Sequence, residues 1–168
     1  VGELPRLSAE RIREELLKVL DADAAPSRAL ELYRESGALE VLYPELGELA
    51  DRAPAAWAGA LATLDRLPRG RTLLRLAAIL RSVEPRAAVQ VLLRLKLSNA
   101  QVEQTACRAS APPLPGAGLP DRELRRWLSS VGPAHLPAVA RLDLAAARAA
   151  GNLRQAGEVV ASWRRARA

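Results

Sequence analysis

The side chains that most often carry catalysis are scarce in this chain. One histidine, His135, and one cysteine, Cys107, occur among 168 residues. A hydrolytic metal centre needs several His and Asp side chains around its cations, and a nucleophilic thiol needs a base beside it. The position of His135 two residues after Pro133 predicts a capping or solvent-facing side chain, and Cys107 falls on a predicted helix as a packing residue. We therefore expect no catalytic residue and no metal site.

Two aspartates, Asp21 and Asp23, form an Asp-x-Asp pair. Paired carboxylates can hold two Mg²⁺ ions in nucleotidyl-transfer enzymes, but that chemistry also needs a preceding Gly-Ser loop to take the triphosphate. No such loop precedes Asp21, and Gly70-Arg71-Thr72 is too short for a phosphate cradle. The Asp-x-Asp pair is thus predicted to be a solvated loop between helices.

Arginine is the residue type that remains for chemistry. Of 25 basic residues 23 are arginine, a bias that suits bidentate phosphate contacts and that a GC-rich genome would also produce. Up to Ala53 there are 7 basic and 12 acidic residues, a net charge of −5; from Pro54 onward 18 basic and 7 acidic residues give +11. Because neutralised phosphates supply sequence-independent nucleic-acid affinity, the second part is predicted to meet a polyanion.

The elements that must position these arginines are predicted to be helices throughout. Ala, Leu, Arg and Glu dominate, Phe and Met are absent, and β-branched residues are sparse, so we expect an all-α protein. The central helices, 73–80 and 89–97, are predicted to pack as an antiparallel pair broken at Pro85. The proline-rich segment 111–120 is predicted to be the clearest hinge. The other helices are expected at 8–21, 26–36, 38–42, 55–66, 99–107, 121–131, 136–150 and 153–167.

The sequence also carries information about the cellular location of the protein. No apolar run approaches the roughly 20 residues of a membrane-spanning helix, and residues 1–20 carry charges throughout and no apolar core of a signal peptide. A single cysteine agrees with a reducing compartment. We expect a cytoplasmic protein without membrane contact and, because the chain begins at Val1 and contains no Met, a fragment of a longer polypeptide.

The first helices carry motifs of a known enzyme family. A Ser-x-Glu-Arg-Ile-x-x-Glu-Leu run is followed by a Glu-Ser-Gly turn and by Pro-Glu-Leu. This pattern resembles the RNA-binding neck of the class II bacterial tRNA nucleotidyltransferases (CCA-adding enzymes) and poly(A) polymerases. The matching residues are Ser8, Glu10, Arg11, Ile12, Glu15, Leu16, Glu35-Ser36-Gly37 and Pro44-Glu45-Leu46.

The resemblance continues into a body and a tail. In family members with an HD-type metal site, helices similar to VWEHTLATLDRLP and RLAALLHDVGKP supply a metal-binding His and a His-Asp pair. This chain has Gly59 and Arg81-Ser82 at those positions, so the resemblance implies a degenerate HD body without metal. LRRW at 124–127 and RLDLAAARAAG at 141–151 are similar to the family's tail. Asp143, at the family's recurring Asp, is expected to be a surface or salt-bridged residue.

The resemblance implies three parts: a neck at 1–53, a degenerate body at 54–111 and a tail at 112–168. It implies an RNA-binding region that holds tRNA while a head domain, absent from this chain, adds nucleotides to the 3′ end. The fragment itself would then catalyse nothing, and Mg²⁺ and nucleoside triphosphates would belong to the head. The competing hypothesis is a helical protein-interaction module that has lost the RNA role.

Exposed arginines of the basic part are the predicted RNA contacts. For any one group the alternative is an ordinary solvated helix face. The tryptophans are predicted to pack in the core, with Trp163 beside Arg164 kept as a candidate for base stacking. The predicted RNA-binding residues are Arg66, Arg69, Arg71, Arg75, Lys96, Arg122, Arg125, Arg126, Arg164 and Arg165.

Overall fold

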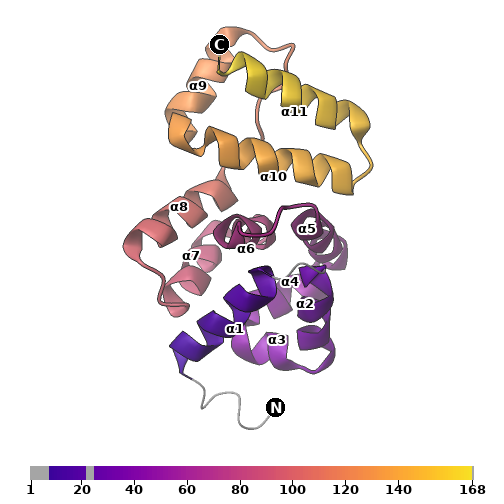
Figure 1. Cartoon of the computed structure of the whole chain (residues 1–168), viewed down its shortest axis with the longest axis vertical. Coiled ribbons are helices and arrows are strands. Elements are labelled where there is room, and N and C mark those ends of the chain that lie inside the picture. Colours follow the sequence, from indigo (N-terminus) through magenta and orange to yellow (C-terminus); the bar gives the residue numbers. More distant parts are fainter. Residues whose placement is uncertain (1–7, 22–24, 168) are drawn as a thin grey trace.

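The computed structural model describes residues 8–21 and 25–167, and throughout these residues the chain is all-α, as predicted (Figure 1). No helix in this described part is long and apolar enough to cross a membrane. The elements are α1 (Ala9–Asp21), α2 (Pro26–Glu35), α3 (Ala38–Leu42), α4 (Pro44–Arg52), α5 (Pro54–Asp65), α6 (Thr72–Leu80), α7 (Pro85–Arg94), α8 (Asn99–Ser110), α9 (Asp121–Val131), the 3₁₀ helix η2 (Pro133–His135), α10 (Leu136–Ala149) and α11 (Leu153–Arg165).

Local sequence signals set most of these boundaries. Four helices, α2, α4, α5 and α7, begin with a proline, whose fixed φ and missing N–H suit the first helical position. Gly37 separates α2 from α3 with a left-handed φ of 71°, which glycine adopts without a Cβ clash. Ser98 and Gln101 form a capping box that starts α8. The helix boundaries were therefore largely predictable.

The first hydrophobic core joins α1 to α8 and includes Leu142 and Ala145 of α10. Helix α6 lies inside this core, with every residue from Leu74 to Leu80 buried. It packs on α5 and α8, whereas α7 packs on α8 and α4. The predicted antiparallel pairing of these two central helices is therefore wrong. A helix that is buried on all sides has several partners, and its sequence does not say which one is adjacent.

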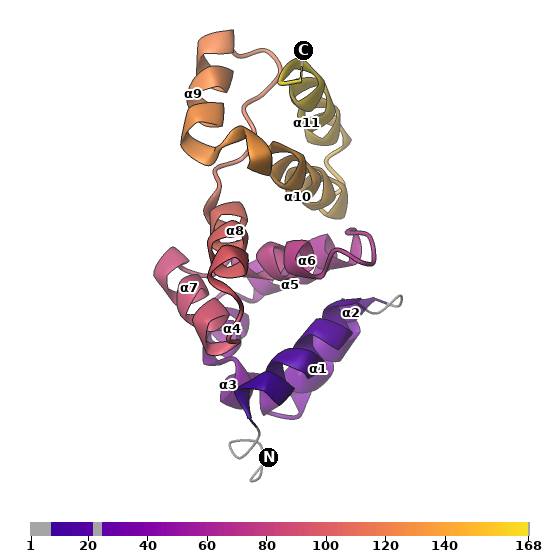
Figure 2. The same cartoon turned by 60° about the vertical axis from the view of Figure 1, so that its left-hand side comes forward.

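The buried face of α7 also differs from the predicted one. Val91 and Leu92 are buried, together with Ala88 and Leu95, while Leu93, predicted to face inward, is 49% exposed. A second core joins α9, α10 and α11 around Trp127 and Val139 (Figure 2). Helices α1 to α8 thus share one core, and the second core begins with Ala111 and Leu114.

The proline-rich segment 111–120, predicted to be the clearest hinge, is held by hydrogen bonds along its length. Side chains from both cores donate hydrogen bonds to five of its backbone carbonyls, and a carboxylate accepts a hydrogen bond from one of its backbone amides. These bonds run from Arg81 to Ala111 O (3.2 Å), Trp127 to Pro112 O (3.0 Å), Ser162 to Pro115 O (2.6 Å), Arg165 to Ala117 O and Leu119 O, and Leu114 N to Asp143 (2.7 Å). Proline content alone could not reveal these tertiary contacts.

Candidate nucleic-acid interface

Arg75 is a buried structural residue, so its prediction as an RNA contact is wrong. It is 4% exposed, and its guanidinium donates to the carbonyls of Leu20 (2.7 Å) and Leu67 (2.8 and 3.2 Å). These bonds tie the end of α1 to the α5–α6 loop. A charged group at this depth is kept by its hydrogen bonds, and no surface remains for a phosphate.

Lys96 lies apart from the other predicted contacts, in the turn between α7 and α8. Its ammonium is 2.8 Å from Glu10 of α1, and its hydrogen bond and charge lower the pKa of Glu10 to about 2. Arg13 of α1 donates to the Lys96 carbonyl (3.1 Å). These contacts assign Lys96 to the docking of α1 on the body.

The tail arginines gather at the far end of the second core, where the start of α9 meets the end of α11 (Figure 1). Arg122 and Arg126 lie 3.6 and 3.0 Å from Glu123. Arg165 donates to the proline-rich segment and pairs with Asp121 at 3.0 Å. Two further predicted contacts, Arg125 and Arg164, are exposed, and no ion pair is found for them among the described residues.

Trp163 is half-buried in the second core. Arg167 lies over its ring, 5.6 Å from the centroid, so this face of the indole is already occupied by a cation. Trp57 and Trp127 are buried, as predicted. The structure therefore offers little open ring surface at Trp163 for a base.

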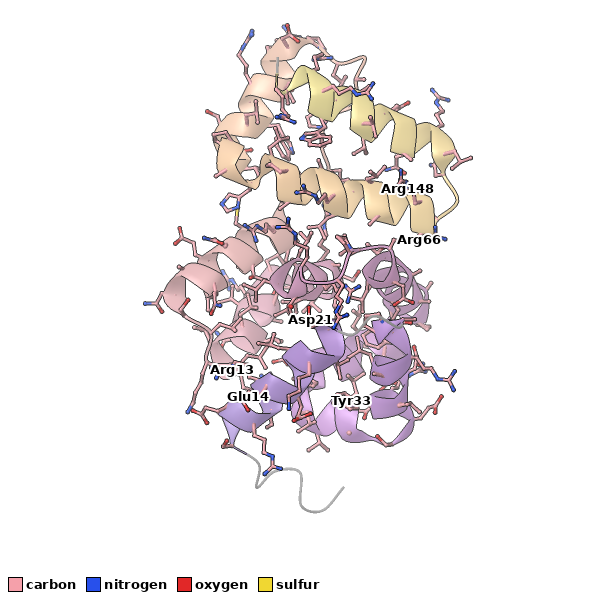
Figure 3. All side chains as sticks on the ribbon, viewed as in Figure 1. Arg13, Glu14, Asp21, Tyr33, Arg66 and Arg148 are labelled. Atoms are coloured by element: carbon pink, nitrogen blue, oxygen red, sulfur yellow. The ribbon has the colours of Figure 1, made fainter. Side chains whose placement is uncertain are left out.

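Arginines from separate elements meet where the α5–α6 loop, α8 and α10 come together. Exposed Arg66, Arg69 and Arg71 come from the loop; Arg141 and Arg148, seven residues apart on α10, share one helix face. Figure 3 shows Arg66 and Arg148 at the same edge of the molecule, and α10 packs on α5. We call this surface the arginine face: Arg66, Arg69, Arg71, Arg108, Arg141 and Arg148.

Half of the arginine face was missed by the sequence prediction. Arg108, Arg141 and Arg148 were not among the predicted contacts, although the seven-residue spacing of Arg141 and Arg148 is a signal that periodicity could have used. The neighbouring acids are occupied: Asp65 accepts from the amide (3.1 Å) and hydroxyl (2.6 Å) of Ser27. Asp21 accepts from Gly70 N (3.0 Å) and the Thr72 hydroxyl (3.3 Å).

Asp21 is thus bound to the α5–α6 loop and is not the solvated residue that was predicted. Asp23, its partner in the Asp-x-Asp pair, lies outside the described residues. His135 occupies the N-cap position of α10 without a capping bond from its side chain, and it is half-buried instead of solvent-facing. Cys107 is half-buried against the Val131 carbonyl (3.6 Å), and burial raises the pKa of its thiol. This confirms Cys107 as a near-core packing residue.

The acidic first part uses several of its carboxylates to dock on the rest of the chain. Glu31 accepts from the Trp57 indole (2.7 Å), and Glu45 pairs with Arg94 through two hydrogen bonds. Burial would raise the pKa of Glu45, but the hydrogen bonds and charge of Arg94 outweigh it and lower that pKa. Glu31 and Glu45 therefore join Glu10 and Asp21 as carboxylates of this part that bind the body.

The positions that correspond to the metal ligands of the resembled family line one cavity of about 730 Å³ between the two cores. Gly59, Arg81, Ser82 and Asp143 line it, and eleven alanines make up much of the remaining wall; we call it the alanine cavity. Asp143 is 6% exposed and pairs with Arg81 at 2.6 Å. Asp143 is thus the salt-bridged residue that was expected, although it is buried.

These residues do not fit a metal ion. A guanidinium stands where a ligand would be needed, and it already binds Asp143, the one carboxylate among the described residues that line the cavity. Among residues 8–21 and 25–167, no three His, Cys, Asp or Glu side chains are grouped so that they could hold a metal.

Comparison with known proteins gives a family match for the first part of the chain. Residues 1–49 match the family model described as the probable RNA and SrmB-binding site of polymerase A. The match includes α1 to α3 and most of α4, the part that carries the Ser-x-Glu-Arg-Ile and Pro-Glu-Leu motifs. No curated protein and no solved structure gives a significant match.

Proposed function

We propose that this chain is the RNA-binding region of a polymerase-A-like protein and that it grips tRNA while a catalytic head adds nucleotides to the 3′ end. The match of residues 1–49 to the RNA-binding site of polymerase A carries this proposal. Mg²⁺ and nucleoside triphosphates would be bound by the head. The degenerate body, with Arg81 and Asp143 paired in the alanine cavity, would serve as scaffold.

The arginine face supplies the phosphate contacts in this proposal. Residues 1–49 contain 6 basic and 11 acidic residues, so the matched helices by themselves repel a polyanion. The arginine face lies beyond them, on the α5–α6 loop, α8 and α10, and its neighbouring acids, Asp65 and Asp21, accept hydrogen bonds from Ser27, Gly70 and Thr72. The matched helices would then act chiefly by docking on the body that presents the arginines.

Such a grip would follow the shape of an RNA helix and not its sequence. Guanidinium groups bind backbone phosphates, and the major groove of A-form RNA is closed to side chains. Holding the acceptor stem at a constant distance from the head supplies proximity, while the chemical step belongs to the head.

A second candidate function is a protein interface. The matched family model is described as binding SrmB as well as RNA. Within the matched helices Leu32 of α2 is 55% exposed and Val41 of α3 is 41% exposed, and such side chains suit a protein partner. This candidate corresponds to the interaction module that the sequence left as the alternative.

The test is a titration of fluorescent tRNA lacking its CCA end, at several salt concentrations, beside a duplex DNA of equal charge. We expect tighter binding to tRNA and a steep salt dependence. Arg66→Ala with Arg148→Ala should reduce the slope of log K against log salt by about 2, since each lost phosphate contact lowers it by about 1.

The matched control is Arg34→Ala with Arg52→Ala, which removes the same charge from α2 and α4. Both arginines are paired with glutamates of their own helix. An equal loss in the control would overturn the assignment to the arginine face. Equal or negligible binding of tRNA and DNA would favour the protein interface.

A further inference from the structure

We propose that a preformed pocket at the junction of the two cores binds a phosphate ester. The pocket has a volume of about 470 Å³, within the range of small-molecule sites, and lies between the α5–α6 loop, α8 and α10. Among the described residues that line it there are three arginines and no acid. Its lining, called the arginine pocket, is Gly70 to Leu74, Arg108, Ala134, Pro137, Ala138 and Arg141.

None of the three guanidinium groups is neutralised by a described carboxylate. Arg141 donates to the Pro137 carbonyl of its own helix (3.2 Å), and Arg108 donates to Gln104 (3.4 Å). The Nε of Arg108 is buried and lacks a partner among the described residues. Three like charges around one pocket repel each other, and a buried donor without an acceptor costs free energy. A phosphate would relieve both costs through charge-assisted hydrogen bonds.

The backbone adds to the positive electrostatic potential of the pocket. The first turn of α6, Thr72 to Leu74, lines the pocket, and its N-cap residue is Arg71, whose side chain cannot accept a hydrogen bond from the helix amides. The positive end of the α6 dipole therefore reinforces the arginines. Asp21 contacts this loop by accepting from Gly70 N and the Thr72 hydroxyl, but it is not part of the lining. One carboxylate leaves the three arginines in excess.

The pocket is roomier than inorganic phosphate requires, so the ligand class is a phosphate carrying a further group. A nucleotide and an RNA backbone phosphate share this chemistry. The inference goes beyond the proposed function, because a free nucleotide would bind here whether or not tRNA does. It also couples the two cores: the α5–α6 loop and α8 belong to the first, while Ala134 and Pro137 lie beside the second, so a bound phosphate should stabilise their contact.

The experiment is thermal unfolding of the whole chain with AMP, with adenosine and with penta-adenylate RNA, at constant ionic strength. We expect AMP or penta-adenylate to raise the midpoint by about 3–6 °C at roughly ten times its Kd, and adenosine to have no effect. A shift with AMP identifies a free nucleotide as a sufficient ligand. A shift with penta-adenylate alone identifies the RNA backbone as the source.

Variants then locate the site. Arg71→Gln with Arg141→Gln changes two exposed side chains, so the ligand-free midpoint should stay the same while the ligand-induced shift disappears. The control, Arg125→Gln with Arg164→Gln, alters exposed arginines at the far end of the tail and should keep the shift. No shift with any phosphate-bearing ligand, or a shift that survives in Arg71→Gln/Arg141→Gln, would overturn the proposal.

This outcome is separate from the outcome for tRNA. If AMP shifts the midpoint but tRNA does not bind, the pocket stands and the proposed function fails. If tRNA binds with a steep salt slope but no ligand acts through Arg71 and Arg141, the proposed function stands and the pocket is overturned.

Discussion

Two hollows at the junction of the cores, the alanine cavity and the arginine pocket, lie on different faces of α10 and use arginine in opposite ways. In the alanine cavity Arg81 is 17% exposed and its charge is matched by Asp143 at 2.6 Å. In the arginine pocket Arg71, Arg108 and Arg141 face the same space without a described acid. The first arrangement holds the protein together, and the second leaves charge available for a ligand.

The comparison teaches that the partner of a guanidinium, more than its place in the sequence, decides its role. Arg75 and Arg71 are four residues apart, yet Arg75 holds two backbone carbonyls inside the core and Arg71 lies exposed at the pocket. Arg165 likewise serves the carbonyls of the proline-rich segment. Substitutions at Asp143, Arg165, Glu45 and the pair Arg71 and Arg141 test this division between structural and available arginines.

Asp143→Ala should lower the free energy of unfolding by about 3–5 kcal/mol, because it leaves the Arg81 charge and the Leu114 amide without their buried acceptor. Urea unfolding monitored by circular dichroism measures this loss. The matched control is Glu48→Ala, which removes a carboxylate also 2.6 Å from an arginine but on an exposed surface. That control should cost less than about 1 kcal/mol. A similar small loss for both variants would show that Asp143 is not needed for the fold.

Arg165→Ala should cost about 1–3 kcal/mol, since the carbonyls of Ala117 and Leu119 lose their donor and Asp121 loses its partner. Hydrogen exchange should show the loss first in the proline-rich segment. Arg164→Ala, the exposed neighbour, should leave both measurements unchanged. If the hydrogen-exchange rates of this segment are the same in Arg165→Ala as in the parent, the hydrogen bonds from Arg165 do not stabilise it.

The Glu45–Arg94 pair should make stability fall in acid. The pKa of Glu45 is lower when folded than when unfolded, so its contribution is complete above the ordinary carboxyl range and is lost as pH falls through the lowered pKa. Glu45→Gln should therefore lose less stability than the parent between about pH 7 and pH 3. The difference should stay below about 1 kcal/mol, because the Arg94 side chain is 44% exposed. Parallel acid curves for parent and variant would contradict this.

Arg71→Gln with Arg141→Gln should change the free energy of unfolding by less than about 0.5 kcal/mol, since neither residue has an ion pair among those described. The same variant should weaken tRNA binding and lower its salt slope by about 2. Urea unfolding and the tRNA titration, run on one preparation, give both values. A large loss of stability would show that Arg71 and Arg141 stabilise the fold, as Arg81 does in the alanine cavity.

Most of the fold was predictable because its boundaries depend on local chemistry. Proline at the start of α2, α4, α5 and α7 and the left-handed glycine after α2 act within one turn of chain. The pairing of α6 with α5 and α8 and the fastening of the proline-rich segment depend on residues that are distant in sequence. Periodicity identifies a buried face but not the face it meets.

The all-α class, most of the helix boundaries and the division into an acidic first part and a basic remainder all follow from the order of the amino acids. Tertiary contacts are needed to tell which arginines bind other parts of the protein and which remain available to a ligand. The reason is that guanidinium charge is identical along the chain, whereas its availability depends on whether a carboxylate or carbonyl arrives from another element. Asp143 pairs with Arg81 from 62 residues away in the sequence. The described residues that line the arginine pocket include no acid.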